Sequence, residues 1–323
     1  MKKRLLFFLK LIIGCALLAV VFWVVDLHSV TELLGRVHLG YYLLSLAIFF
    51  LCWLVNTMKW QLILSGLRCD VDFWTLLKFN FSSFYFALVL PGGQATGELI
   101  KCYRVAKTGD NKLPLVLSVF MDRLTGLAGS VTLGIVGLIF SATVLPNRGA
   151  LLAISIAFAL LSAIFLGLLF FPWMNHWLVR LLKFIFGFAW FKNKFDPQAI
   201  TKAGETFKGS YAMLAIALVF SLAFQILGTI CVHYLALSLG LTIGLLDLLW
   251  VYSLVSIVLL VPVSLMGLGL REGSFVGLLA LLAIPGYAAV SLSLLVFTVN
   301  LFAALCGGFM ELVHYLVSLK RKK

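Results

Sequence analysis

Six long apolar runs constrain this sequence more than any other feature. A helix that spans a bilayer needs about 20 apolar residues, and each run is long enough. They are Leu5–Leu27, Tyr41–Leu64, Leu113–Val144, Leu151–Trp173, Tyr211–Leu239 and Tyr287–Leu319. Only 11% of the 323 residues are charged, against about 25% in soluble domains. The sequence excludes a soluble enzyme, a secreted domain and a disordered tail, and predicts an all-α polytopic membrane protein with six full transmembrane helices.

Two further apolar regions are interrupted near their centres. They are Phe73–Val105, broken at Pro91, Gly92, Gly93 and Gly97, and Leu245–Ile284, broken at Pro262, Gly267 and Gly269. Proline interrupts a helix, and irregular backbone at membrane depth is tolerated only inside protein or beside a cavity. We therefore expect two re-entrant helical hairpins, each of which enters and leaves the membrane on the same face.

The distribution of basic residues predicts the orientation of the chain. Lys and Arg number 25 and Asp and Glu 12, so the formal net charge is +13. With a cytoplasmic N-terminus, nearly all the basic residues fall on inside loops and only Arg36 and Arg148 fall outside. This asymmetry follows the positive-inside rule. It predicts an inner-membrane protein with both termini in the cytoplasm.

The two interrupted regions also predict an inverted repeat. Three full spans separate them, so the hairpins open on opposite faces, and a similar Leu-Leu sequence precedes each proline by a similar distance. Weak self-similarity in any long apolar chain is the alternative. The repeat divides the chain into an N-terminal half, 1–172, with the hairpin 73–107; a linker, 173–208; and a C-terminal half, 209–323, with the hairpin 245–284. Related elements of opposite orientation are typical of transporters with a site near the bilayer midplane.

The linker has the pattern of a helix lying on the membrane surface. Its large apolar residues recur every three or four positions, from Trp173 to Phe195, and four basic residues fall on other faces, at Arg180, Lys183, Lys192 and Lys194. Such a helix lies at the cytoplasmic interface and is attracted to anionic lipid.

Charged residues within the apolar runs are the candidate site. Placing one charged side chain at the centre of the membrane costs roughly 2.5–3.5 kcal/mol on insertion scales, so we expect each of these residues to have a structural or functional role. Glu98, Lys101 and Arg104 share one face of a helix that Thr96 would cap, although Arg104 is equally explained by contact with lipid headgroups. Asp122 and Arg123 lie near mid-membrane, and neighbours in sequence do not face each other on a helix. We expect each of these two to pair with another element.

Further candidates are less specific. Arg271 and Glu272 follow a glycine-rich turn that would expose backbone N–H groups to an anion, and an arginine can bind phosphate bidentately. Asn56 and Lys59 lie near the end of the second span, where snorkelling explains Lys59 taken alone. Four isolated polar residues are interpreted as packing or interface residues: Gln225, His233, Asn300 and Glu311. Gly126, Ser130 and Gly134 form a stripe that lets another helix approach.

Metal and nucleotide chemistry have no motif in the sequence. The six cysteines lie in or beside apolar runs without a C-x-x-C pair, and the five histidines form no H-x-x-x-H pair. The sequence also contains no P-loop. We expect no cofactor, no metal and no nucleic-acid partner.

Four short motifs stand in order along the chain. They are Asn56-Thr57-Met58-Lys59-Trp60, the run from Pro91 to Glu98 with Arg104, Asp122-Arg123, and the run from Pro262 to Glu272. Together they resemble the flippase-like transmembrane domain of the lysylphosphatidylglycerol synthetase family over nearly the whole chain. The resemblance implies a multi-pass inner-membrane protein that moves aminoacylated phosphatidylglycerol, another phospholipid or a lipid-linked glycan between leaflets. We expect the chain to depart from the family in two ways. It ends at Lys323 without the transferase domain of the fused members, and it has Gly93 and Gln94 at positions where basic residues are common in relatives.

The leading hypothesis is a lipid translocase without enzymatic activity. An anionic or aminoacylated headgroup would bind in a central polar cavity to Arg271, Glu272, Arg123, Asp122, Glu98, Arg104, Lys59 and Asn56. One alternative is an integral-membrane lipid transferase with a carboxylate as base. Another is an accessory subunit that docks a cytoplasmic lipid-modifying enzyme through the basic linker. The partners expected are membrane lipids, and a homo-oligomer is compatible with the sequence.

Overall fold

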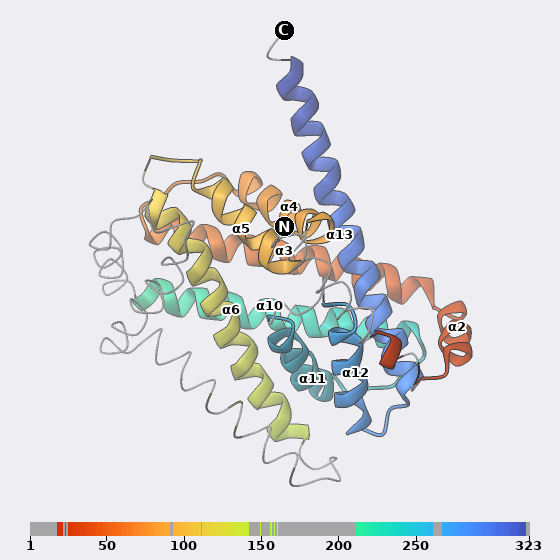
Figure 1. Ribbon diagram of the computed structural model, residues 1–323. Helices are drawn as coiled ribbons and strands as arrows, with labels where there is room; N and C mark the ends of the chain where they lie inside the picture. Colours follow the sequence, from red (N-terminus) through yellow and green to blue (C-terminus); the bar gives the residue numbers. More distant parts are fainter. Residues whose placement is uncertain are drawn as a thin grey trace.

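The described part of this protein is a bundle of helices. The computed structural model describes residues 18–21, 23, 25–90, 93–110, 112–141, 149, 156, 158, 160, 211–260 and 267–320. The helices in this part are α2 (Leu27–Gly35), α3 (Leu39–Gly66), α4 (Phe73–Val89), α5 (Gln94–Val105), α6 (Lys112–Ser141), α10 (Tyr211–Ser238), α11 (Leu245–Val258), α12 (Leu270–Ala280) and α13 (Gly286–Lys320). Figure 1 shows α3 and α10 crossing the middle of the bundle beside each other, with α13 projecting towards the C-terminus.

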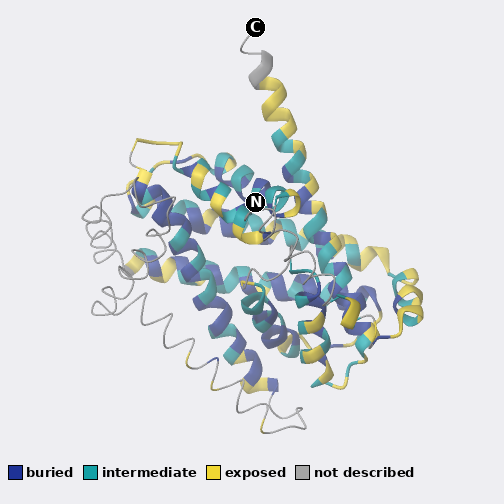
Figure 2. Ribbon diagram, in the orientation of Figure 1, coloured by how far each residue is buried: buried dark blue, intermediate teal, exposed yellow. Residues whose placement is uncertain are grey.

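Four of these helices are long and apolar enough to cross a membrane: α3, α6, α10 and α13. They confirm the expected spans at Tyr41–Leu64, Leu113–Val144, Tyr211–Leu239 and Tyr287–Leu319 to within a few residues. The expected spans Leu5–Leu27 and Leu151–Trp173 lie almost wholly outside the described residues, as does the linker 173–208. Phe309 and Leu305 are among the exposed large apolar residues, as expected for helices that face lipid. Figure 2 shows exposed residues along the outer faces of the helices.

Each interrupted region consists of two short helices. The region Phe73–Val105 forms α4 and α5, and Leu245–Ile284 forms α11 and α12. The breaks therefore occur where the sequence predicts them, although Pro91, Gly92 and Pro262 lie outside the described residues. The re-entrant path of the two regions stays a prediction.

Glycines with positive φ begin the second helix of each pair. Gly93 has φ +58° and precedes α5, and Gly269 has φ +78° and precedes α12. These are conformations that only glycine adopts without strain. Two expectations were wrong here. Thr96 is not the N-cap of α5, and Gly97 is not part of the break, because the helix starts at Gln94 and includes both residues.

Gly97 instead allows α4 and α5 to lie close together. A Cβ atom added to it would lie 2.3 Å from the backbone oxygen of Ser83 on α4. Glycine is the residue that permits such an approach between helix backbones. Gly97 therefore lets the two helices of the first pair approach closely at this point.

The order of helices in the first half recurs in the second. A long helix, two short helices and a long helix follow one another as α3–α4–α5–α6 and again as α10–α11–α12–α13. The two series pack crosswise, with α4 against α13 and α11 against α6. Each crossed contact includes a glycine at which an added Cβ would meet backbone: Gly307 lies against Phe81, and Gly137 lies against Leu246 and Trp250.

The short helix α2 precedes the first of these long helices. Asp26 caps it by accepting hydrogen bonds from the Ser29 hydroxyl at 2.7 Å and from the His28 backbone N–H at 3.0 Å. This cap satisfies a backbone N–H group at the start of α2 and stabilises the helix.

Candidate functional site

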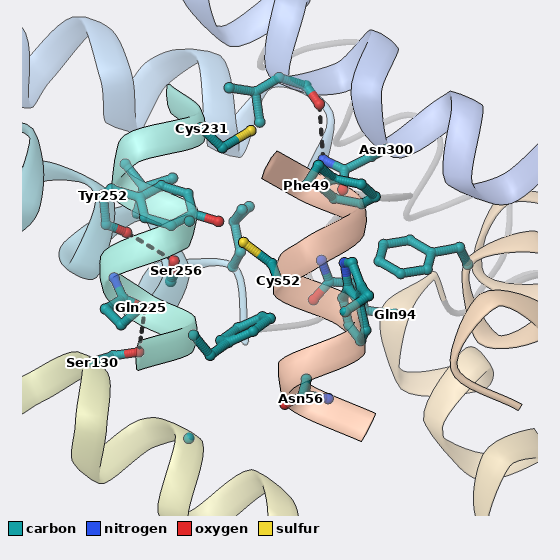
Figure 3. A pocket seen from close by; sticks show the side chains of 18 of the residues that line it. Phe49, Cys52, Asn56, Gln94, Ser130, Gln225, Cys231, Tyr252, Ser256 and Asn300 are labelled. Carbon is teal, nitrogen blue, oxygen red and sulfur yellow. Dashed lines mark hydrogen bonds between the residues drawn. The ribbon is translucent and has the colours of Figure 1, made fainter. Parts of the chain in front are cut away.

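A cavity of about 250 Å³ lies between the two helix series. Residues from α3, α4, α5, α6, α10, α11, α12 and α13 line it. Figure 3 shows part of its wall, with Cys52 and Asn56 on α3 facing Gln225 and Cys231 on α10 across the opening. Because both series contribute, a change in how they pack would reshape the cavity.

The wall of the cavity combines charged and apolar surface. Aromatic rings from three helices form one part of it, with Trp53 on α3 packed edge-on against Phe84 on α4 and Phe224 on α10. Five charged side chains from α3, α5 and α6 form another part. We call these five the charge cluster: Lys59, Glu98, Lys101, Asp122 and Arg123.

Asp122 lies at the centre of the charge cluster and contacts two lysines. Its Oδ1 lies 3.0 Å from Lys59 Nζ and its Oδ2 lies 3.2 Å from Lys101 Nζ. Lys59 Nζ also donates to the Asp122 backbone carbonyl at 3.0 Å, and Lys101 Nζ lies 4.1 Å from the centre of the Trp60 ring. Both lysine side chains are 2% exposed. The explanation of Lys59 by snorkelling was therefore wrong, because its ammonium group is held inside the protein.

Arg123 pairs with Glu98, which lies on α5. The Arg123 side chain is 42% exposed and that of Glu98 is 23% exposed, so this pair is more open than the lysine pairs. Glu98 Oε1 accepts the hydrogen bond from Arg123, whereas Oε2 is buried and has no hydrogen-bond partner in the described part of the chain. Asp122 and Arg123 thus each bind another element, as their adjacency in sequence predicted.

Arg271 and Glu272 form a second charged group at the start of α12. Arg271 donates to Glu272 Oε1 at 2.5 Å and to Ser293 Oγ on α13 at 3.0 Å. Glu272 Oε2 accepts the Gly269 backbone N–H at 2.6 Å, which is the return bond of a helix cap. Glu272 is fully buried, and both its oxygens bind protein. Its contacts are those of a residue that caps α12 and orients Arg271, which lines the cavity.

Arg104 lies apart from the charge cluster. It forms a bidentate ion pair with Glu311 on α13, and the Ser82 hydroxyl on α4 donates to the same carboxylate. From the sequence, Glu311 was interpreted as an isolated packing or interface residue, and this interpretation was wrong. A single acid in a long apolar run was the available signal, but its partner lies 207 positions away.

Gln225 is a second residue whose role in the site was not predicted from the sequence. Its side chain lines the cavity and accepts a hydrogen bond from Ser130 on α6 at 2.9 Å (Figure 3). It also donates to Ser253 on α11 at 3.0 Å. These bonds join three helices inside the cavity wall. The small-residue stripe is confirmed at Gly134, where an added Cβ would lie 2.4 Å from Phe158 and 3.1 Å from Ser253.

Asn56 also lines the cavity, together with the first residues of two helices. Gln94 begins α5 and Arg271 is the second residue of α12. Helix N-termini carry partial positive charge. The start of α5 therefore adds to the positive potential of the cavity, whereas the Glu272 carboxylate offsets the partial charge at the start of α12. Among the described residues, no group of three His, Cys, Asp or Glu side chains is placed to hold a metal ion.

The comparison with known families is decisive for the class of protein. The sequence matches the family described as "Lysylphosphatidylglycerol synthase TM region" over residues 7–308. The chain belongs to this family. Its membership and its four long apolar helices show an integral membrane protein with a role related to membrane lipids. A search of curated proteins found no match.

Proposed function

We propose that this member of the lysylphosphatidylglycerol synthase TM region family is a lipid translocase. The observation that carries the proposal is the cavity between the two helix series, which combines apolar walls with an excess of positive charge. The charge cluster contains three cations and two carboxylates, so it has one net positive charge when all five groups are ionised. This charge matches the single negative charge of a phosphodiester.

The size of the cavity supports a site for the headgroup alone. Its volume of about 250 Å³ is just below the roughly 300–1,000 Å³ of pockets that enclose drug-sized ligands. Lipid chains would stay in the surrounding membrane while the headgroup passes through the protein. Charge inside a membrane is costly, and the cavity would supply the compensating groups.

The repeated order of helices supports alternating access. In transporters built from inverted repeats, one repeat rocks against the other around a fixed central site. The crossed packing of α4 on α13 and of α11 on α6 has the exchange symmetry expected of such repeats. The proposal includes re-entrant paths for both helix pairs, an inner-membrane location and cytoplasmic termini, all supported by the distribution of basic residues in the sequence.

Reconstitution into liposomes tests the proposal. The vesicles would contain fluorescent phosphatidylglycerol or lysylphosphatidylglycerol, and a membrane-impermeant quencher would report how fast the inner-leaflet probe becomes accessible. We expect transfer faster than in protein-free vesicles. Arg123→Gln should slow it about tenfold or more, since hydrogen bonds to charged groups contribute roughly 1.5–3 kcal/mol.

The matched control is Arg36→Gln. Arg36 also pairs with a glutamate, Glu32, but both side chains are largely exposed and lie outside the cavity. Its transfer rate should equal that of the unmodified protein. Transfer rates equal to those of protein-free vesicles for every anionic and aminoacylated lipid would refute the proposed function.

A further inference from the structure

We propose that Glu98 is an internal substitute for the lipid phosphate. In this inference, which rests on the proposed function, Glu98 holds Arg123 while the cavity is empty and gives it up when an anionic headgroup arrives. Glu98 is then a positioning residue that sets the affinity and release of the headgroup. Asp122 has a different task and stays bound to its two lysines.

The two acids of the charge cluster differ in how firmly they are held. Asp122 contacts Lys59 and Lys101 at 3.0 and 3.2 Å, and all three side chains are at most 5% exposed. An incoming headgroup cannot reach these lysines without opening a buried network. Arg123 is 42% exposed, which makes its guanidinium the accessible cation of the cluster.

The chemistry of the exchange favours a phosphate. Arginine presents a planar set of donors that binds a carboxylate or a phosphate through two oxygens. Glu98 occupies this position with one oxygen only, while Oε2 stays buried without a hydrogen-bond partner in the described part of the chain. A phosphodiester could satisfy two donors of Arg123, which gives it an advantage over the resident carboxylate.

The displaced carboxylate has another cation within reach. Lys101 follows Glu98 by three positions on α5, a spacing that brings side chains together on a helix. Movement of the Glu98 carboxylate from Arg123 towards Lys101 would need no change in the backbone of α5.

The charge balance predicts which headgroups drive the exchange. The cluster has one excess positive charge, so a monoanionic headgroup makes the occupied site neutral. A headgroup with no net charge leaves the excess uncompensated, and one with two negative charges reverses it. Uncompensated charge away from water is unfavourable, so monoanionic lipids should bind best.

Binding of dihexanoyl phosphatidylglycerol to the detergent-solubilised protein tests the inference. We expect Glu98→Gln to bind this lipid about tenfold tighter or more, because the competing charge is gone. The same variant should transfer fluorescent phosphatidylglycerol more slowly, since release becomes limiting. Dihexanoyl phosphatidylcholine, which has no net charge, should gain much less affinity.

Glu32→Gln is the matched control. Glu32 also pairs with an arginine, Arg36, but both side chains are largely exposed and lie outside the cavity lining. The affinity of this variant for dihexanoyl phosphatidylglycerol should equal that of the unmodified protein. If Glu98→Gln is poorly folded on its own, the lipid should raise its melting temperature by more than it raises that of the unmodified protein.

The outcomes separate this inference from the proposed function. If the unmodified protein transfers lipid but Glu98→Gln binds it no more tightly and gains no extra thermal stabilisation, the role of Glu98 is refuted and the translocase stands. If the unmodified protein neither binds nor transfers any of the lipids, both are refuted. Tighter binding with slower transfer supports the exchange.

Discussion

Asp122 connects two lysines that come from different helices, and this limits which residues of the cavity can be changed safely. Lys59 lies on α3 and Lys101 on α5, so the carboxylate on α6 joins three elements. Removal of one partner from a buried ion pair leaves an uncompensated charge. Asp122 is therefore expected to matter for folding before it matters for binding.

We predict that Asp122→Asn lowers the free energy of unfolding by about 3–5 kcal/mol, the usual cost of breaking a buried ion pair from one side. Thermal or denaturant unfolding in detergent would measure the loss. Replacing the whole group, as in Lys59→Met/Lys101→Met/Asp122→Leu, should recover most of it, because no buried charge is left unpaired. An Asp122→Asn variant as stable as the unmodified protein would contradict this account.

Residues of the site could be recognised from the sequence, but their partners could not. Asp122 and Arg123 had to pair elsewhere because adjacent residues diverge on a helix, and they do. Which residues they meet depends on how α3, α5 and α6 cross, and no local pattern encodes that. The pair of Arg104 with Glu311 was missed for the same reason, since it joins α5 to the far end of α13.

At the scale of elements, glycine sets how closely the crossed helices approach. An added Cβ at Gly307 would lie 2.1 Å from the backbone oxygen of Phe81, so α13 would have to move away from α4. We predict that Gly307→Ala lowers the free energy of unfolding by about 1–3 kcal/mol, the usual cost of overpacking.

Gly277→Ala is the matched control for this prediction. Gly277 lies inside α12 with nothing within 4 Å of an added Cβ. Alanine there should be neutral or should stabilise the protein by about 0.5–1 kcal/mol, because it favours the helix. Unfolding curves should therefore show a lower free energy of unfolding for Gly307→Ala and an unchanged or higher one for Gly277→Ala.

The start of α12 gives a second prediction at this scale. Gly269 has φ +78°, a conformation in which an alanine is strained. Gly269→Ala should cost about 1–3 kcal/mol of stability and should also disturb Arg271, which α12 presents to the cavity. Circular dichroism during thermal unfolding would measure the cost, and a variant of unchanged stability would show that this backbone is less constrained than its geometry indicates.

The elements themselves were largely accessible from the sequence. The length of the apolar runs predicted the four long helices, and the proline and glycine residues predicted both breaks. The exact start of α5 was not accessible, since Thr96 has the chemistry of an N-cap but Gly93 has the positive φ that the turn requires. At this position the backbone geometry, and not the side-chain preference for an N-cap, determines where the helix begins.

At the scale of the whole molecule, two contacts between serine and a carboxylate join the helix series beyond the cavity. The Ser82 hydroxyl on α4 donates to Glu311 on α13, and the Ser141 hydroxyl on α6 donates to Asp247 on α11. Ser141 and Glu311 each lie ~16 Å beyond the last cavity residue of their helix, at about 1.5 Å per residue. Because α6 and α13 run in opposite directions (Figure 1), the two contacts lie at opposite ends of the cavity.

We predict that weakening the contact at Glu311 opens the cavity from that end. Cys52 lines the cavity and is 3% exposed, so a protein with Cys52 as its single cysteine should react slowly with a membrane-impermeant maleimide. Glu311→Gln should increase the labelling rate several-fold, since Arg104 loses its charged partner. Glu32→Gln, which removes an exposed pair, should leave it unchanged. Equal labelling rates in all three proteins would contradict a closing role for Glu311.

The crossed packing of the two series also affects how the chain is made. Ser82 and Glu311 are 229 positions apart in sequence, and a ribosome adds about 5–20 residues each second, so roughly 10–50 s pass between their syntheses. During this interval α4 has been made but lacks the helix it packs against. The charge cluster can form within the first helix series, whereas Ser82 and Arg104 must wait for α13 before they meet Glu311.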